Sequence, residues 1–206
     1  MGELPLGSDP GATDRAGPTF AERSMQAPTG FVVPEGTPSP ERWLMPNAKD
    51  ICAQLDQLQA SGADFDEILT TAVQLLHDSH PHFDWTGIYE LFPDDVLRLG
   101  PFIGAPTDHV FISVGNGVCG SAVAEGRNKN IPDVSKEPNY LACSTATKSE
   151  LVVLIKDASG IYAQIDIDSH ELDAFDQKTE REVERVATWL AKAYAAHASA
   201  QTTNSI

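Results

Sequence analysis

The thiols of Cys52, Cys119 and Cys143 are the most reactive side chains in this chain of 206 residues. They are too few and too dispersed to form the disulfide framework of a small secreted protein. None lies in a CxxC or Cys/His spacing that predicts a metal site. This pattern leaves redox or nucleophilic thiol chemistry as the function to consider.

Cys119 lies in a glycine-rich turn, GNGVCG, that leads into a predicted short helix. The free N–H groups and the dipole at such a helix start favour a thiolate, which makes Cys119 a candidate nucleophile or redox site. The alternative is a small buried residue, because free cysteines are often buried. Cys143 ends a proline-containing loop of the kind that covers ligand pockets. A disulfide between the two requires Cα atoms roughly 4.4–6.8 Å apart, which the sequence leaves open.

A group of acidic residues is the second candidate for chemistry. Asp166 and Asp168 alternate with Ile165 and Ile167, so both carboxylates face one side of a strand. On a partly enclosed face they would repel each other and lose hydration, which raises at least one pKa and provides a proton donor near neutral pH. Glu150, which opens the neighbouring predicted strand, is a possible third member. The alternative is a solvated strand face that carries acidic residues.

Trp85 and Tyr89 are the aromatic candidates for a binding pocket. They are four residues apart on one predicted strand and therefore share a face, where they can wall a small apolar pocket. Aromatic residues on strands more often belong to the core. His109 is a candidate base, although a lone histidine usually has a structural explanation.

Apolar residues at helical spacing predict the helices that position these side chains. The first helix ends at Gly62, which is suited to a C-terminal cap, and Cys52 lies on its apolar face, where we expect a core residue. Asp64 is the expected N-cap of the second helix, and Asp176 opens a long amphipathic helix near the end of the chain.

Strand-forming segments joined by short turns lie between the second and the last helix. The turns at residues 93–95 and 157–160 join their neighbours as hairpins do, which favours an antiparallel sheet. We therefore predict an α+β fold with the terminal helices on one face of the sheet and ligand-pocket loops on the other. Strands are expected at residues 83–92, 96–102, 109–114, 150–156 and 161–167, with a short helix at 118–125 and an edge segment near 130.

Composition sets the domain limits and excludes some partners. Residues 1–45 are rich in Pro, Gly, Ser and Thr and predict a disordered N-terminal arm, followed by one domain at 46–198 and a flexible tail at 199–206. The net charge of -16 argues against nucleic acid and anionic membranes as partners, because they require clustered Lys and Arg. The chain has neither a signal-peptide pattern nor a run of roughly 18 apolar residues, so we expect a cytoplasmic protein.

Six short segments, taken in order, resemble the signature of free methionine-R-sulfoxide reductases, a family of GAF domains. The resemblance covers about residues 83–190. Each segment is common by itself, but their order and spacing together are specific. The expectation of a GAF fold comes from this resemblance and not from the helix and strand periodicity. The segments are DWTGIY at 84–89, LGPF at 99–102, VGNGVCG at 114–120, LAC at 141–143, SE at 149–150 and IDIDS at 165–169.

The resemblance implies an enzyme that reduces the R-sulfoxide of free methionine. A thiolate attacks the sulfoxide sulfur, methionine leaves, and a second cysteine resolves the sulfenic acid before thioredoxin reduces the disulfide. By position, Cys143 resembles the nucleophile and Cys119 the resolving partner, although the two roles can be exchanged. The resemblance implies no metal and no cofactor.

The remaining matched residues would bind the substrate. Glu150, Asp166 and Asp168 match the carboxylates that hold and protonate the sulfoxide oxygen. Trp85 and Tyr89 match the aromatic walls around its S-methyl group.

Two departures from the family pattern leave alternatives open. The family commonly carries a third cysteine on the strand before the glycine-rich turn, where this chain reads Asp108-His109-Val110. Ser144 stands where an acidic residue is common. A non-catalytic GAF module that binds a small ligand, or a thiol redox sensor, is therefore the alternative to the reductase. The flanking helices suggest a homodimer.

Overall fold

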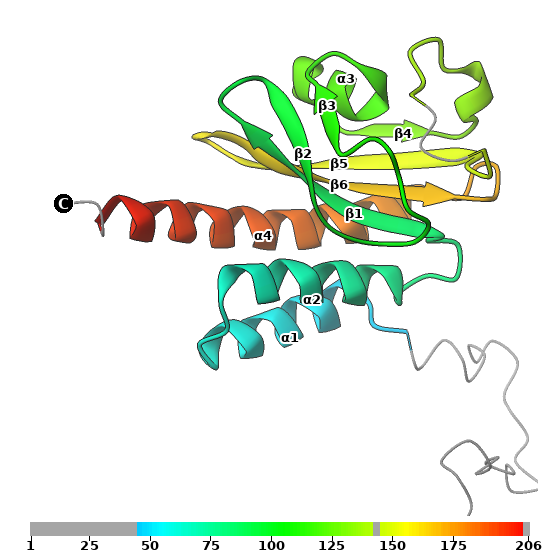
Figure 1. The fold of residues 1–206 in the computed structure, drawn as a ribbon. Coiled ribbons are helices and arrows are strands. Elements are labelled where there is room, and N and C mark those ends of the chain that lie inside the picture. Colours follow the sequence, from blue (N-terminus) through cyan, green and yellow to red (C-terminus); the bar gives the residue numbers. More distant parts are fainter. Residues whose placement is uncertain (1–44, 142–144, 204–206) are drawn as a thin grey trace, which may run out of the picture. The chain divides into compact units, whose positions relative to one another are not determined.

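A six-stranded antiparallel sheet forms the centre of the computed structural model, which describes residues 45–141 and 145–203 (Figure 1). The strands follow the order β3-β2-β1-β6-β5-β4, and each neighbouring pair is antiparallel, as the short turns predict. Their bounds are β1 Trp85–Phe92, β2 Val96–Ile103, β3 Phe111–Ser113, β4 Lys129–Ile131, β5 Ser149–Asp157 and β6 Gly160–Ser169.

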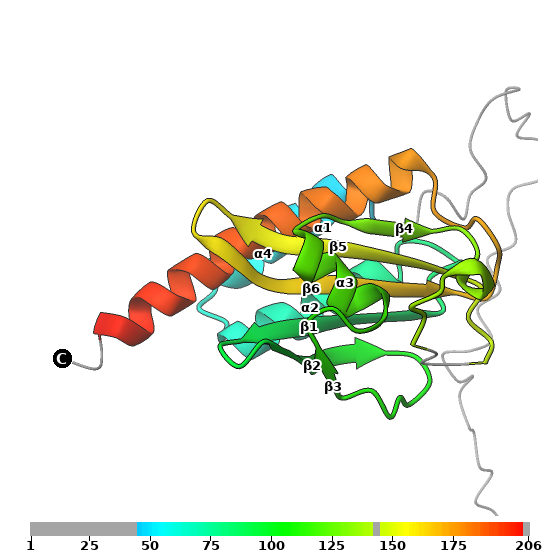
Figure 2. The same cartoon turned by 90° about the horizontal axis from the view of Figure 1, so that it is seen from above.

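Three helices cover one face of this sheet. Helices α2, Phe65–His77, and α4, Gln177–Thr203, pack against the strands, while α1, Ala48–Ala60, packs against both helices (Figures 1 and 2). The Asp64 side chain accepts a hydrogen bond from the Glu67 N–H at the start of α2, and Asp176 accepts one from the Thr179 N–H at the start of α4. These contacts confirm both predicted helix starts.

The main hydrophobic core lies between the sheet and these helices. Strand residues alternate between the two faces, and one set of aliphatic residues from β1, β5 and β6 points to the helices. Ile88, Leu151, Ile165 and Ile167 are fully buried there, against helix residues such as Leu190. The alternation predicted for Ile165 and Ile167 is confirmed.

A second, smaller core lies on the opposite face under helix α3, Gly117–Glu125. Val118 and Ala122 of α3 pack there with Leu97, Ile112 and Leu154 of the sheet. The short helix η3, Val134–Lys136, follows β4 in the chain. Figure 1 shows α3 on the side of the sheet away from α1, α2 and α4. The expected placement of helices and connecting segments on opposite faces is therefore confirmed.

Some boundaries and one side chain differ from expectation. Helix α4 continues to Thr203, past residue 198 at which the sequence places the domain end, and the Ser199 hydroxyl donates a hydrogen bond to the Ala195 carbonyl one turn earlier. Cys52 packs at the edge of the main core but is only partly buried.

The predicted N-terminal arm, apart from Met45, lies outside the described residues. Among the described residues, no helix is long and apolar enough to cross a membrane.

The substitution Gly120→Ala tests how closely α3 packs on its own turn. A Cβ at position 120 would lie 2.4 Å from the Ser113 carbonyl oxygen and 3.0 Å from the Gly115 nitrogen, so the backbone must move. We expect the free energy of unfolding to fall by about 1–3 kcal/mol, as for other overpacked sites. Urea unfolding measures this loss. The exposed Ala124→Ser change in the same helix is the control, and equal stability of the two variants would contradict the packing argument.

Candidate functional site

The strand register gathers the predicted acidic residues on the face opposite the long helices. Asp168 of β6 lies directly across from Trp85 of β1 on one side and from Glu150 of β5 on the other. Asp166 is two residues from Asp168 on β6 and therefore shares its face. All three acids are buried, with 6% of Glu150, 2% of Asp166 and 4% of Asp168 exposed. The alternative of a solvated acidic strand face is thus wrong.

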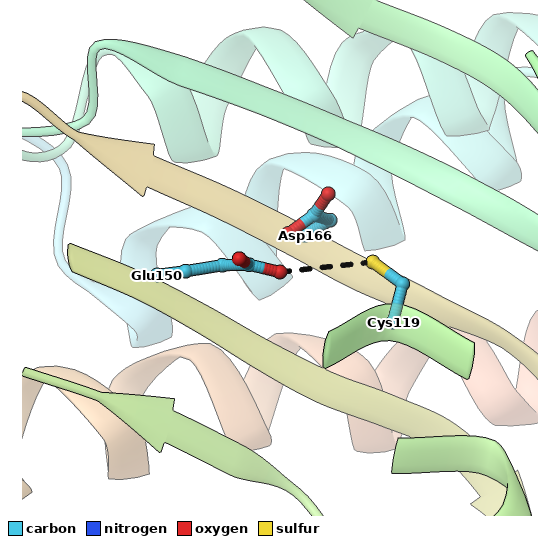
Figure 3. A group of neighbouring side chains, drawn as sticks. All are labelled: Cys119, Glu150 and Asp166. Atoms are coloured by element: carbon cyan, nitrogen blue, oxygen red, sulfur yellow. Dashed lines mark hydrogen bonds between the residues drawn. The ribbon is translucent and has the colours of Figure 1, made fainter. Parts of the chain in front are cut away.

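Cys119 reaches the same cluster from α3. Its Sγ donates a hydrogen bond to Glu150 Oε1 at 3.9 Å, and Figure 3 shows the Asp166 carboxylate beside both side chains. The turn before α3 is closed by a hydrogen bond from the Gly115 N–H to the Gly120 carbonyl at 2.8 Å. Only 4% of Cys119 is exposed, so it is buried, but against carboxyl groups as well as apolar residues.

Burial and mutual repulsion keep these carboxyl groups protonated at higher pH than usual. Desolvation raises the pKa of Glu150 well above its ordinary value, and the charges of Asp166 and Asp168 raise it further. Desolvation and the charge of Asp166 likewise raise the pKa of Asp168. The pKa of Asp166 is raised by desolvation to about 7. Near neutral pH the cluster therefore contains carboxylic acids that can donate a proton, as predicted.

Trp85 and Tyr89 lie on β1, which pairs with the strand β6 that carries Asp166 and Asp168. Their ring centroids are 6.3 Å apart. The Trp85 Nε1–H donates to the Ala105 carbonyl at 3.1 Å, and the Tyr89 hydroxyl donates to the His109 carbonyl at 2.9 Å. Both rings therefore attach β1 to the segment that precedes β3. His109 contributes its backbone carbonyl to this contact.

Gly87 makes room for the indole, a role that the sequence analysis missed. It lies between Trp85 and Tyr89 on the same face and directly across from Asp166. A Cβ at position 87 would lie 2.4 Å from Trp85 Cη2, so a larger residue would displace the ring. The small residue between two same-face aromatics was the available signal.

A small cavity of ≈ 50 Å³ opens beside Asp168 and Trp85. Its other lining residues include Asp84 and His170, whose side chains lie 3.2 Å apart, and Thr147. A larger groove of ≈ 700 Å³ between α1 and α4, which includes Cys52, is shallow and holds none of the acidic cluster. We assign the site to the smaller cavity because Asp168 of the buried acidic cluster and the aromatic ring of Trp85 both line it.

The loop before Cys143 is attached to the start of α3. The Asn139 side-chain amide donates to the Gly115 carbonyl at 3.0 Å and to Ser121 Oγ at 2.9 Å. Leu141 packs so closely on Gly117 that a Cβ there would lie 2.9 Å from Leu141 Cβ. Cys143 itself lies outside the described residues, so its predicted role stays a prediction.

Gln164 is a second residue that the sequence analysis missed. It stands two positions before Asp166 on β6, directly across from Tyr89 and Leu154, and it is fully buried. Neither its Oε1 nor its Nε2 has a hydrogen-bond partner among the described residues. The strand period that places Asp166 and Asp168 on one face also places Gln164 there, so this signal was present in the sequence.

The comparisons with known proteins agree with this geometry. The model of the GAF domain family matches residues 64–194. Free methionine-R-sulfoxide reductase of Escherichia coli is 34% identical over 146 residues, which are 71% of this chain and 87% of that protein. The chain belongs to the free methionine-R-sulfoxide reductase family of GAF domains. The expected fold and family are confirmed.

Two further relatives support this placement of the GAF domain. Protein YtsP of Bacillus subtilis is 39% identical over 151 residues, covering 71% of this chain and 92% of that protein. The structure of free methionine-R-sulfoxide reductase from Neisseria meningitidis in complex with its substrate superposes with a TM-score of 0.69 at 28% identity. It covers 80% of this chain and 96% of that chain.

The substitution Asp166→Asn tests the buried acidic cluster of this GAF domain. Because folding raises the Asp166 pKa from 3.8 to about 7, the folded state retains a proton that the unfolded state releases, and stability falls as pH rises through this window. Over the whole shift, the free energy of unfolding falls by about 4 kcal/mol at most. Urea unfolding between about pH 5 and pH 7 should therefore show a smaller decline in Asp166→Asn than in the native protein.

An exposed acid provides the control for this experiment. Asp108→Asn removes a carboxylate on the surface and should leave the pH dependence of the native protein unchanged. Parallel stability profiles for the native protein and Asp166→Asn would show that Asp166 does not titrate in this window.

Proposed function

We propose that this chain reduces the R-sulfoxide of free methionine to methionine. The observation that carries the proposal is the buried group of Glu150, Asp166 and Asp168, with the Cys119 thiol at one end and Trp85 at the other. A structural domain has no need for three buried acids to which the described residues supply no basic partner, because such a group destabilises the fold. The named activity of the Escherichia coli relative supports the same proposal.

The acids provide what sulfoxide reduction requires. A sulfoxide oxygen carries a partial negative charge and must accept a proton when the sulfur is attacked. Burial and neighbouring charge raise the pKa values of Glu150 and Asp168, which favours their protonated forms. We assign them as hydrogen-bond donors to this oxygen, and Asp166 as the ionisable neighbour that keeps their protons in place. Trp85 would contact the S-methyl group from the adjoining cavity wall.

The redox step consumes one thiol and leaves a sulfenic acid. Cys143 is proposed to attack the sulfoxide sulfur, so that the oxygen passes to the cysteine and methionine leaves as the sulfide. A second thiol then attacks the sulfenic acid, a disulfide forms and water leaves. Two thiols of thioredoxin would return the disulfide to the reduced state. Thioredoxin as the reductant, a cytoplasmic location and a homodimer stay predictions.

Cys119 is the resolving thiol proposed for this chain, since residues 108–110 contain no cysteine. In the described structure its thiol donates to Glu150 and is buried, so resolution requires this thiol to leave the carboxyl group and reach the sulfenic acid. The contact between Leu141 and Gly117 brings the described end of that loop to the start of α3.

The activity test follows oxidation of NADPH with free methionine-R-sulfoxide, thioredoxin and thioredoxin reductase. We expect Cys143→Ser to abolish turnover because it removes the attacking thiol, and Cys119→Ser to permit a single turnover without thioredoxin-dependent cycling. Cys52→Ser, which lies in the groove between α1 and α4, is the matched control and should retain activity. A folded native protein without turnover, with either thioredoxin or dithiothreitol, would favour a ligand-binding or redox-sensing GAF domain.

The substitution Glu150→Gln tests proton donation. Glutamine keeps the size and can still form hydrogen bonds, but it cannot transfer the carboxyl proton. We expect kcat/KM to fall by roughly 10²–10⁴-fold, the usual contribution of general acid catalysis. Glu90→Gln is the control, because Glu90 is a partly buried acid of β1 on the face covered by the helices. Equal losses in the two variants would remove Glu150 from the proposed mechanism.

A further inference from the structure

Cys119, Glu150 and Asp166 form a compact group of potential metal ligands. One ligand atom from each, the Cys119 sulfur and one carboxylate oxygen from each acid, lies within 4.8 Å of the other two. They come from α3, β5 and β6, and all three are buried (Figure 3). A site built from three packed elements is held in place by the fold rather than by one mobile loop.

Asp166 supplies a second, independent observation. Its Oδ1 is buried and has no hydrogen-bond partner among the described residues, and only 2% of the side chain is exposed. Within residues 45–141 and 145–203, no Lys, Arg or His forms an ion pair with Asp166 or Glu150. A buried carboxylate oxygen without a hydrogen-bond partner destabilises the fold, and a cation bound between these side chains would compensate for it.

We propose that Cys119, Glu150 and Asp166 bind a divalent transition-metal ion, with zinc as the best match. A thiolate selects zinc or a similar ion over magnesium and calcium, which prefer ligand sets made of oxygen atoms. Tetrahedral zinc places its sulfur and oxygen ligands roughly 3.3–3.8 Å apart. The observed separation of 3.9 Å between Cys119 Sγ and Glu150 Oε1 is close to this range. Binding forms one Zn–S and two Zn–O bonds and releases the thiol proton and any carboxyl protons to solvent.

The metal and a sulfoxide would compete for the same side chains. This consequence rests on the proposed reductase function, because it assumes that the sulfoxide oxygen binds to Glu150. Zinc would then act as a reversible inhibitor of the reduced enzyme. Metal binding itself requires no turnover, so the two proposals can fail separately.

Cobalt(II) is the probe for the test, because a thiolate bound to it gives an ultraviolet charge-transfer band. The full-length double variant Cys52→Ser/Cys143→Ser contains Cys119 as its one remaining cysteine, since the chain has three. We expect this variant to develop the band with one equivalent of Co²⁺, to lose it when Zn²⁺ is added, and to retain it when Mg²⁺ is added. Absence of the band in the folded variant would overturn the proposal.

Substitutions in this background identify the remaining ligands. Cys119→Ser should abolish the band, and Asp166→Asn and Glu150→Gln should each weaken Co²⁺ binding by at least about tenfold, since even second-shell partners contribute 10–100-fold. Glu90→Gln, on the opposite face of the sheet, should leave the affinity unchanged. Circular dichroism confirms that each variant is folded. An unchanged affinity in Asp166→Asn and Glu150→Gln would show that the thiol binds cobalt without the acids and would overturn the site.

Discussion

Repulsion among three buried carboxyl groups is the constraint on which the site depends. The antiparallel register sets Glu150 across from Asp168, with Asp166 on the same face. Two charges about 5 Å apart repel by roughly 3 kcal/mol even at an effective dielectric constant of 20, so the cluster cannot hold three charges. It must retain protons or take up a cation. Both the proton donation proposed for catalysis and the proposed metal site follow from this one requirement.

The opposite face of the same strands compensates for the cluster. Ile165 and Ile167 alternate with Asp166 and Asp168 and are buried against the helices, together with Leu151 of β5. Each fully buried aliphatic side chain contributes roughly 1.5–3 kcal/mol. In β6, the buried isoleucines therefore stabilise a strand whose alternating aspartates destabilise it when they are ionised. This arrangement explains why a two-layer fold with long helices on one face can tolerate a costly polar site on the other.

Local patterns in the sequence predict much of this arrangement. The period of two places Asp166 and Asp168 on one face, and the turn at 157–160 leads to the β5–β6 pairing that brings Glu150 beside them. Burial could not be predicted in the same way, because alternation of polar and apolar residues usually indicates a solvated face. The cover is supplied by α3, whose position depends on close tertiary contacts at Gly120. Gln164 follows the same period as the acids but matched no catalytic pattern.

The segment at residues 108–110 lacks the third cysteine that the family resemblance predicts, and it contacts the aromatic wall of the pocket. The His109 carbonyl accepts a hydrogen bond from the Tyr89 hydroxyl, so the segment where the family resemblance predicts a thiol here holds an aromatic ring of the pocket. Resolution of an oxidised Cys143 would then fall to Cys119, whose thiol is bonded to Glu150 in the described structure. Under the proposal, the Cys119 thiol must leave the acids before it can resolve the sulfenic acid. The redox step therefore depends on whether Glu150 is bonded to Cys119. In the proposed mechanism, release of the sulfoxide oxygen from Glu150 and release of Cys119 from the same carboxyl group are parts of one cycle.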